Sequence, residues 1–276
     1  MNPLLELYYL EEADSICSNR ALMTLAEKGI DDWIPRNLVL LNRDQFKPKY
    51  LKLNPKAQVP TLVHDGKVIR ESSIICNYID DLKPNPALKP KDPVDRCLLT
   101  EWIKESDESG YQATASLNFV TKFRLEIPRE QMEERWKSVP DIDRLHRQQS
   151  CIYEGLDSPY VLRAIGAWER TFMSMENTLS DGRPWIMGDQ FTLVETTIVP
   201  FIKVLDMLRL LHLWLDGRPN VRRWWGGVTN RASYQSLEEY PGQGDDDEAP
   251  HAKAGAVVAD EIKELLEYYR RTIPQL

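Results

Sequence analysis

Short strand patterns are confined to the first 83 residues of this 276-residue chain, where they come in the order β-α-β and then β-β-α. Residues 4–9 alternate apolar and polar side chains, which predicts a strand, and residues 36–41 form a second β-rich run. Between them, residues 15–29 read as a helix that ends at Gly29. This order predicts a sheet with one parallel crossover.

A hairpin is predicted next. Residues 61–65 and 67–71 are short β-rich runs, and the Asp65-Gly66 pair between them supplies the two positive φ angles of a type I′ turn. An apolar-striped helix is expected over residues 72–82. We therefore expect an α+β domain over residues 1–83 with a mixed four-stranded sheet covered by helices.

The second part of the chain, residues 93–276, shows no convincing strand pattern and is expected to be an all-α domain. Long helical patterns cover residues 97–109, 159–180 and 193–215. Residues 124–156 are polar, which suggests a surface excursion between helices.

A Gly-, Ala- and Asp-rich stretch over residues 241–256 reads as a flexible linker. Beyond it, an amphipathic helix with Val258, Ile262, Leu265 and Tyr269 on one stripe is expected to dock back on the domain.

Composition excludes several classes of function. The formal net charge of −8 argues against general binding to nucleic acid or to an anionic membrane. No window approaches the roughly 18 apolar residues of a membrane span. The four cysteines form no C-x-x-C pair, and acids stand where a signal peptide carries bases, so we expect a reduced, cytoplasmic protein. The four histidines show no i,i+4 spacing, so no metal site is expected.

The start of the first predicted helix carries Ser15, Cys17 and Ser18. Unpaired N–H groups and the helix dipole stabilise an anion there. Either serine could only cap the helix, or its hydroxyl could bind an exogenous anion. Cys17 is either a low-pKa nucleophile or an ordinary buried thiol.

Two further segments could bind a peptide-like ligand. Pro60 stands at the start of a predicted strand, and a cis bond there would turn the Val59 main chain outward to pair with an extended ligand. Glu71 favours an ammonium group, whereas the helix beginning at Ser72 favours a carboxylate. Residues 43–56 carry five bases against one acid, which is either an anion-attracting loop or a solvated charge run.

These motifs, in this order, resemble the cytosolic glutathione transferase family over essentially the whole chain. Residues 15–29 resemble the family's catalytic helix, residues 54–62 its cis-proline strand, and residues 71–75 its γ-glutamyl-binding turn. Residues 188–195 resemble the capping-box start of a helix in its helical domain, with Glu195 where the family usually has Asp. The resemblance implies a thioredoxin-like domain followed by a helical domain.

The resemblance also implies site residues. Ser15 falls where serine-type classes keep their catalytic hydroxyl and is the first choice, Cys17 or Ser18 the second, and Tyr8 or Tyr9 a distant third. Glutathione, as co-substrate, would then be held by five residues by motif match: Gln45, Val59, Pro60, Glu71 and Ser72.

The length of the chain and its excursion are similar to bacterial β-etherases, which cleave lignin-type aryl ethers with glutathione. The implied function is attack of a glutathione thiolate on an apolar or aromatic electrophile, as in detoxification, by a homodimer. Alternatives are a general conjugating transferase, a zeta-like cis-trans isomerase and a non-enzymatic scaffold of the same fold. We expect apolar side chains at seven positions to line the electrophile pocket: Trp102, Tyr111, Phe119, Phe123, Trp168, Phe201 and Leu205.

Overall fold

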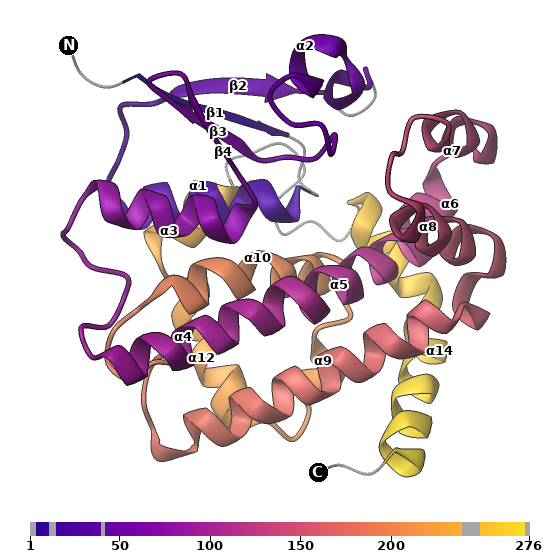
Figure 1. Ribbon diagram of the computed structural model, residues 1–276. Helices are drawn as coiled ribbons and strands as arrows, with labels where there is room; N and C mark the ends of the chain where they lie inside the picture. The colour runs from indigo at the N-terminus through magenta and orange to yellow at the C-terminus, as the bar shows by residue number, and fades with distance from the viewer. Residues whose placement is uncertain (1–3, 11–14, 40–41, 239–248, 274–276) are drawn as a thin grey trace. The chain divides into compact units, whose positions relative to one another are not determined.

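The computed structural model describes residues 4–10, 15–39, 42–238 and 249–273 (Figure 1). The chain divides into two compact units. We call the first the sheet unit; it comprises Met1–Ile103, Met187–Pro200 and Gly227–Gly244. The second is the helical unit, which comprises Lys104–Ile186, Phe201–Gly226 and Asp245–Leu276.

The sheet unit contains the predicted mixed four-stranded sheet, in the order β2-β1-β3-β4. Strand β1 runs parallel to β2 and antiparallel to β3, and β3 is antiparallel to β4. The strand bounds are β1 Leu5–Leu10, β2 Ile34–Leu38, β3 Thr61–His64 and β4 Lys67–Arg70. This confirms the predicted fold class, a thioredoxin-like mixed sheet followed by helices.

Strand β2 lies earlier than the sequence predicted, because it covers residues 34–38 and not 36–41. It is an edge strand, and Arg36 and Asn37 are exposed, so apolar side chains do not mark it. Residues 40 and 41 of the predicted strand lie outside the described part of the chain.

The predicted hairpin is confirmed, with φ values of 49° at Asp65 and 78° at Gly66. The Asp65 carboxylate also accepts a hydrogen bond from the Leu4 N–H at 2.9 Å, which ties the turn to the chain before β1.

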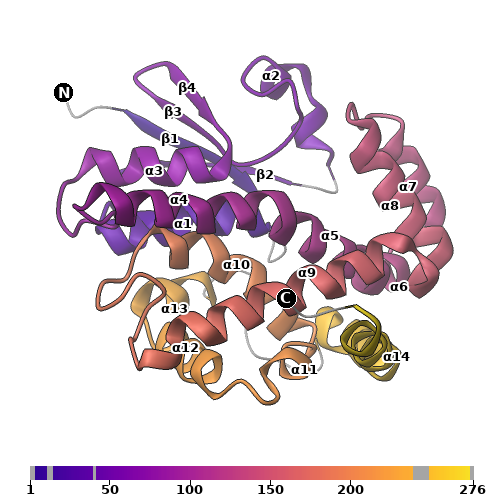
Figure 2. The ribbon, with the colours of Figure 1, turned by 60° about the horizontal axis from the view of Figure 1, so that its bottom comes forward.

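Helices α1 Ile16–Lys28 and α3 Ser72–Leu82 pack against each other and lie along one face of the sheet (Figures 1 and 2). Gly29 ends α1 in the left-handed conformation, as predicted. A buried ion pair joins the two helices, because Lys28 Nζ donates to Asp80 Oδ1 at 2.5 Å. The sequence predicted both helices but not this ion pair. Because both side chains are buried, each charge needs the other as its partner.

The remaining elements of the sheet unit are shorter or are shared with the helical unit. The elements within it are the 3₁₀ turn η1 Asp44–Phe46, α2 Pro48–Leu51 and α13 Ala232–Glu238. Three helices run from one unit into the other: α4 Pro93–Glu105, α10 Leu193–Met207 and α12 Pro219–Thr229. At the start of α10, Glu195 Oε2 accepts from the Thr192 N–H at 2.9 Å, and Thr192 Oγ1 accepts from the Val194 N–H at 3.3 Å. The predicted capping box therefore forms, with Val194 as the capped residue.

The described residues of the helical unit contain no strand. Its helices are α5 Tyr111–Asn118, α6 Arg124–Glu126, α7 Arg129–Trp136, α8 Ile142–Glu154, α9 Pro159–Thr178, α11 His212–Leu215 and α14 Pro250–Thr272. Helix α5 lies between two π-helical turns, η2 Ser106–Gly110 and η3 Phe119–Phe123. Two 3₁₀ turns, η4 Gly155–Asp157 and η5 Leu179–Asp181, follow α8 and α9.

The segment predicted as a polar surface excursion, residues 124–156, is instead built of helices α6, α7 and α8 with a buried side. Met132, Trp136 and Cys151 are buried, and Trp136 Nε1 donates to Gln148 Oε1 at 3.1 Å. The sequence did not predict this buried side, because the segment carries many charges and some of the side chains that face inward are themselves polar.

The last predicted helix docks as expected, with Val258, Ile262 and Tyr269 buried. Leu266 is buried in place of Leu265, which is only half-buried. The predicted flexible linker was too long at its end, since α14 begins at Pro250; residues 241–248 lie outside the described part of the chain.

Candidate functional site

The beginning of α1 holds a pair of hydroxyl groups. Ser15 Oγ donates to Ser18 Oγ at 2.6 Å, and Ser18 Oγ also accepts from the Leu10 N–H at 3.3 Å. Ser15 occupies the N-cap position, but its side chain makes no capping hydrogen bond. Both serines are buried, Ser15 with 7% exposure and Ser18 with none. The Ser15 hydroxyl therefore does not serve as a helix cap.

The hydroxyl pair leaves one proton available. Ser18 receives two hydrogen bonds, and the described residues offer no acceptor for its own O–H. If both hydroxyl groups rotate, Ser18 donates to Ser15, and the Ser15 O–H then becomes available to donate to another group. In either arrangement one hydroxyl can donate to an added anion at the beginning of α1.

Cys17 lies between the two serines, is half-buried and forms no disulfide. The two tyrosines of the first strand take different positions. Tyr9 is buried edge-on against Trp33, with ring centroids 6.0 Å apart, and Tyr8 lies 6.0 Å from the Tyr50 ring. The structure thus places Ser15, Cys17 and Ser18 together on one helical turn.

The loop before β3 is anchored by buried polar side chains. Asn54 Nδ2 donates to the Gln58 carbonyl at 2.9 Å and to Thr61 Oγ1 at 3.1 Å, and the Tyr50 hydroxyl lies 2.9 Å from Thr61 Oγ1. Burial raises the pKa of Tyr50 to about 12, so it is a neutral hydrogen-bonding group. These bonds fix the chain immediately before Val59.

The Val59–Pro60 peptide bond is cis, as predicted. Within the described part of the chain, the Val59 main chain has no hydrogen-bond partner. Its N–H and C=O are therefore available to an extended, peptide-like ligand.

The beginning of α3 carries Glu71 and Ser72. Glu71 has a φ of 67°, unusual for a residue with a side chain, and its carboxylate pairs with Lys56 Nζ at 2.6 Å. Arg20 Nη1 donates to Ser72 Oγ at 2.8 Å, and both side chains are buried. Arg20 thus links the beginnings of α1 and α3, a role that sequence reasoning left undetermined because helical position alone does not fix side-chain direction.

Gln45, on the turn η1, is only 4% exposed. Neither its Oε1 nor its Nε2 has a hydrogen-bond partner among the described residues. A buried amide without partners is rare in a native fold, and its oxygen and its N–H groups are free to bind a ligand.

The basic loop, residues 43–56, is partly neutralised. Lys47 Nζ lies 2.5 Å from Asp44 Oδ1, and Lys56 pairs with Glu71. The hydrogen bonds from Lys47 and from the Val39 N–H lower the pKa of Asp44. The attraction that this loop exerts on an anion is therefore weaker than its five bases suggest.

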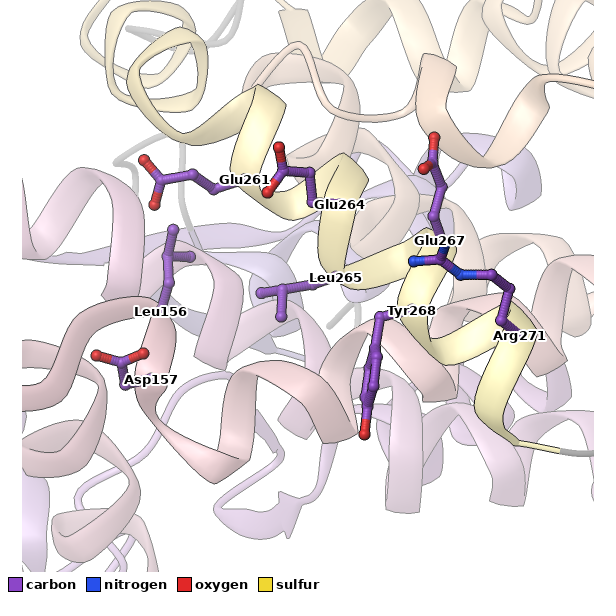
Figure 3. A pocket seen from close by; sticks show the side chains of 8 residues that line it. All are labelled: Leu156, Asp157, Glu261, Glu264, Leu265, Glu267, Tyr268 and Arg271. Atoms are coloured by element: carbon purple, nitrogen blue, oxygen red, sulfur yellow. The ribbon is translucent and has the colours of Figure 1, made fainter.

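Figure 3 shows a separate cavity of about 500 Å³ within the helical unit. Its lining side chains come from α14 and from the turn after α8, and they include four carboxylates and one arginine. They are Leu156, Asp157, Glu261, Glu264, Leu265, Glu267, Tyr268 and Arg271. None of them is a predicted site residue, and the acidic lining disfavours an anionic ligand.

The side chains expected to line an electrophile pocket prove to be mostly core. Trp102 and Tyr111 are half-buried, and the other five are buried: Phe119, Phe123, Trp168, Phe201 and Leu205. The helical spacing of these apolar residues therefore reflects the packing of the helices against one another.

No group of three or more histidine, cysteine or acidic side chains in the described ranges could hold a metal ion. Among the helices that the structure describes, none has the length and apolarity needed to span a bilayer.

Known proteins resemble this chain in two ways: some over most of its length at low identity, and others over a shorter segment at higher identity. A tetrachloro-p-hydroquinone reductive dehalogenase of Sphingobium chlorophenolicum is 23% identical over 244 residues, which cover 82% of this chain and 93% of that protein. Protein LigF of Sphingobium sp. (strain NBRC 103272 / SYK-6) is 40% identical over 96 residues, which cover 33% of this chain but only 36% of LigF.

Solved structures share the fold. The crystal structure of beta-etherase LigF from Sphingobium sp. strain SYK-6 has a TM-score of 0.72 at 23% identity and covers 85% of this chain and 98% of its own. A glutathione transferase from Burkholderia graminis, with two glutathione molecules bound per subunit, has a TM-score of 0.65 at 22% identity and covers 87% and 90%.

Two family models match the sequence. The model of the glutathione S-transferase N-terminal domain matches residues 14–82, which contain the hydroxyl pair, the cis-proline and the beginning of α3. The model of the C-terminal domain matches residues 142–224. The chain belongs to the glutathione S-transferase family.

Proposed function

We propose that this chain is a glutathione transferase that binds glutathione on the sheet unit and stabilises its thiolate at the beginning of α1. Family membership supports this proposal, as does the bound glutathione in the related Burkholderia graminis structure. The observation that carries it is the buried Gln45 amide, whose hydrogen-bonding groups have no partner among the described residues.

Each part of glutathione has a matching group in this proposal. Gln45 binds the glycine carboxylate, and the Val59 main chain pairs with the cysteinyl backbone as a further strand does. Ser72, at the beginning of α3, binds the γ-glutamyl carboxylate, while Glu71 turns from Lys56 to the γ-glutamyl ammonium group. Pro60 shapes the loop.

The thiolate is the nucleophile of the proposed reaction. A free thiol with a pKa near 8.5 is only about 3% ionised at pH 7. A hydroxyl donor and a helix beginning that together lower this pKa by ~2 units stabilise the thiolate by about 2.7 kcal/mol. Ser15 is the proposed donor, Ser18 orients it, and Cys17 has an auxiliary role.

The proposed electrophile is apolar or aromatic, with a β-aryl ether as the first choice because of the similarity to LigF. The thiolate sulfur forms a bond to the β-carbon, the carbon–oxygen bond breaks, and the electron pair leaves with a phenolate. A phenolate or a halide leaves without a dedicated acid, so no further proton donor is required at the leaving group.

Two measurements test this function. Calorimetric titration of glutathione at pH 7 should show binding, whereas no binding at millimolar glutathione would leave a non-enzymatic scaffold. A parallel assay then compares a β-aryl ether, 1-chloro-2,4-dinitrobenzene and maleylacetoacetate as electrophiles. Turnover of the ether supports the etherase, turnover of the chloroarene alone indicates a general conjugating transferase, and turnover of the diacid alone indicates an isomerase.

We further propose that the chain acts as a homodimer. Three exposed apolar side chains of the sheet unit, Ile74 on α3 and Val94 and Leu98 on α4, support this assembly, since a second copy could cover them. Light scattering that gives the 32.0 kDa mass of one chain at all micromolar concentrations would contradict the dimer.

A further inference from the structure

Helix α8 turns an unusual set of side chains inward. Arg144, Arg147, Gln148 and Cys151 recur at three- and four-residue intervals on one stripe of this helix, and all but Arg144 are buried. The Gln148 side chain accepts a hydrogen bond from Trp136 Nε1, which explains why this polar group points inward. No comparable hydrogen bond among the described residues explains why the two arginine side chains point inward.

Arg147 is 6% exposed, and its Nε is enclosed without a hydrogen-bond acceptor among the residues that the structure describes. Its guanidinium lies 5.6 Å from the centre of the Tyr111 ring, a cation–π contact that offsets only part of the cost of burying a charge. No carboxylate in the described part of the chain lies within ion-pairing distance of it.

Arg144, one turn earlier, is half-buried, and its Nε and Nη2 are enclosed without partners in the described part of the chain. Asp141, the acid nearest in sequence, uses Oδ1 to accept the Arg144 main-chain N–H at 2.7 Å and does not pair with the guanidinium. Burial lowers the pKa of Arg144 more than the nearby Tyr111 and Asp141 raise it, and Arg147 adds a smaller lowering effect. Two cations therefore lie on consecutive turns, and neither guanidinium forms an ion pair with a carboxylate of the described residues.

Three partly buried arginines of this chain do have carboxylate partners. Arg218 and Arg270 both bind Glu169, at 2.5 Å and 2.9 Å, and Arg231 binds Glu27 at 2.6 Å. Each of these three guanidinium groups forms an ion pair, whereas Arg144 and Arg147 form none with the described residues. Cys151, on the same stripe as Arg147, supplies no charge, because burial raises the pKa of its thiol.

We propose that Arg144 and Arg147 form an oxyanion-binding site inside the helical unit, bounded on one side by the Tyr111 ring. The guanidinium fork matches the geometry of a carboxylate, sulfate or phosphate and donates paired hydrogen bonds to it. Such an anion would supply the missing counter-charge. The source is either the carboxylate of an organic acid, such as an aromatic acid, or a free inorganic oxyanion.

Binding of simple anions tests the site. Sodium benzoate, benzyl alcohol, sodium sulfate and sodium chloride are compared at equal ionic strength by thermal unfolding and by titration. We expect benzoate or sulfate to raise the midpoint of unfolding in a saturable manner, with neither benzyl alcohol nor chloride doing so. Saturation by benzoate alone identifies an organic acid as the ligand, and saturation by sulfate identifies an inorganic one.

Variants separate a ligand site from a packing role. Arg147→Gln should weaken anion binding at least tenfold and leave the ligand-free midpoint of unfolding unchanged or higher, because an unpaired buried charge has been removed. Arg144→Gln should also weaken binding, and Arg147→Lys should recover only part of it. The matched control is Arg163→Gln, which removes an exposed arginine 5.7 Å from the Tyr160 ring and should change neither property.

Two results would overturn the proposal. One is the absence of saturable stabilisation by either oxyanion at tens of millimolar. The other is anion binding that persists in the Arg144→Gln, Arg147→Gln double variant. A fall in the ligand-free midpoint of Arg147→Gln, combined with unchanged benzoate and sulfate binding, would assign Arg147 to packing.

Discussion

The Ser15 and Ser18 hydroxyl oxygens lie 2.6 Å apart and share one hydrogen bond, and the Leu10 N–H holds the Ser18 oxygen from its other side. Among the described residues, this arrangement leaves one hydroxyl proton for an added anion, and it makes the two serines a coupled unit. Ser18, which is fully buried, is the fixed member of the pair, and Ser15 is the member at the helix start.

The first prediction follows from this coupling. Ser15→Ala should lower kcat/KM with glutathione by about 10- to 1000-fold, the range for loss of one preorganised donor. Ser18→Ala should lower it about 10-fold, and the double variant should resemble Ser15→Ala because the residues act together. Cys17→Ala is the comparison variant and should retain most activity. Loss of turnover in Cys17→Ala alone would shift the mechanism to the cysteine.

Gln45→Met should raise KM for glutathione about tenfold with little change in kcat, because the proposed contact is to a group far from the reacting sulfur. Removing an amide whose polar atoms have no internal partner should not lower the free energy of unfolding. Asn54→Ala serves as the contrast, since the Asn54 side chain makes three internal hydrogen bonds and its loss should destabilise the protein. A Gln45→Met variant with normal KM would exclude Gln45 from the glutathione site.

Tyr50 predicts a change of stability at alkaline pH. Burial raises the pKa of Tyr50 from 10.0 to about 12, so folding favours the neutral phenol over the phenolate by roughly 3 kcal/mol. This contribution is complete below pH 10 and is lost as the pH rises towards 12. The difference in free energy of unfolding between wild type and Tyr50→Phe, measured by denaturant titration, should therefore shrink from pH 9 to pH 11. A constant difference would contradict the shift.

Glu169 predicts the opposite behaviour in acid. Its burial alone would raise the pKa, but the hydrogen bonds from Arg270 and Arg218 outweigh this and lower it. The stabilisation is thus complete above the unfolded pKa and disappears as the pH falls through the lower folded pKa. Glu169→Gln should cost about 3–5 kcal/mol at pH 7, since it leaves two arginines unpaired. This cost should diminish below pH 4, and a cost independent of pH would refute the assignment.

A fifth prediction concerns the docking of α14. A Cβ atom on Gly255 would lie 1.7 Å from the Leu208 carbonyl oxygen, so Gly255→Ala must displace α14 from its position. Gly226→Ala, in α12, meets nothing within 4 Å and is the matched control. We expect a clear fall in the midpoint of unfolding and faster proteolysis near residue 250 for Gly255→Ala only. Equal behaviour of the two variants would mean that α14 does not pack closely there.

The sequence predicted the elements of the sheet unit well because their signals are local. The alternation in β1, the Asp65-Gly66 turn and the Gly29 helix end each depend on a few neighbouring residues. The edge strand β2 was displaced because its exposed face carries no apolar pattern. Similarly, Leu265 and Leu266 are neighbours in the sequence of α14, and only the packing of this helix decides which of the two is buried.

The site was predicted less completely, since its contacts join residues distant in sequence. Motif position placed Ser15 and Ser18, and their three-residue spacing could have suggested contact on one helical face. The Arg20–Ser72 bond spans 52 residues and has no local signal. The inward arginines of α8 were missed because a charged segment normally indicates a solvated surface.

The thiol pKa of glutathione bound to this protein tests the central claim most directly. It is measured by titrating the ultraviolet absorbance of the thiolate in the complex, in wild type and in Ser15→Ala. The account predicts a pKa about 2 units below the free value of roughly 8.5 in wild type and a return towards that value in Ser15→Ala. A bound thiol that keeps its free pKa in wild type, or a pKa that is equally lowered in both proteins, would contradict it.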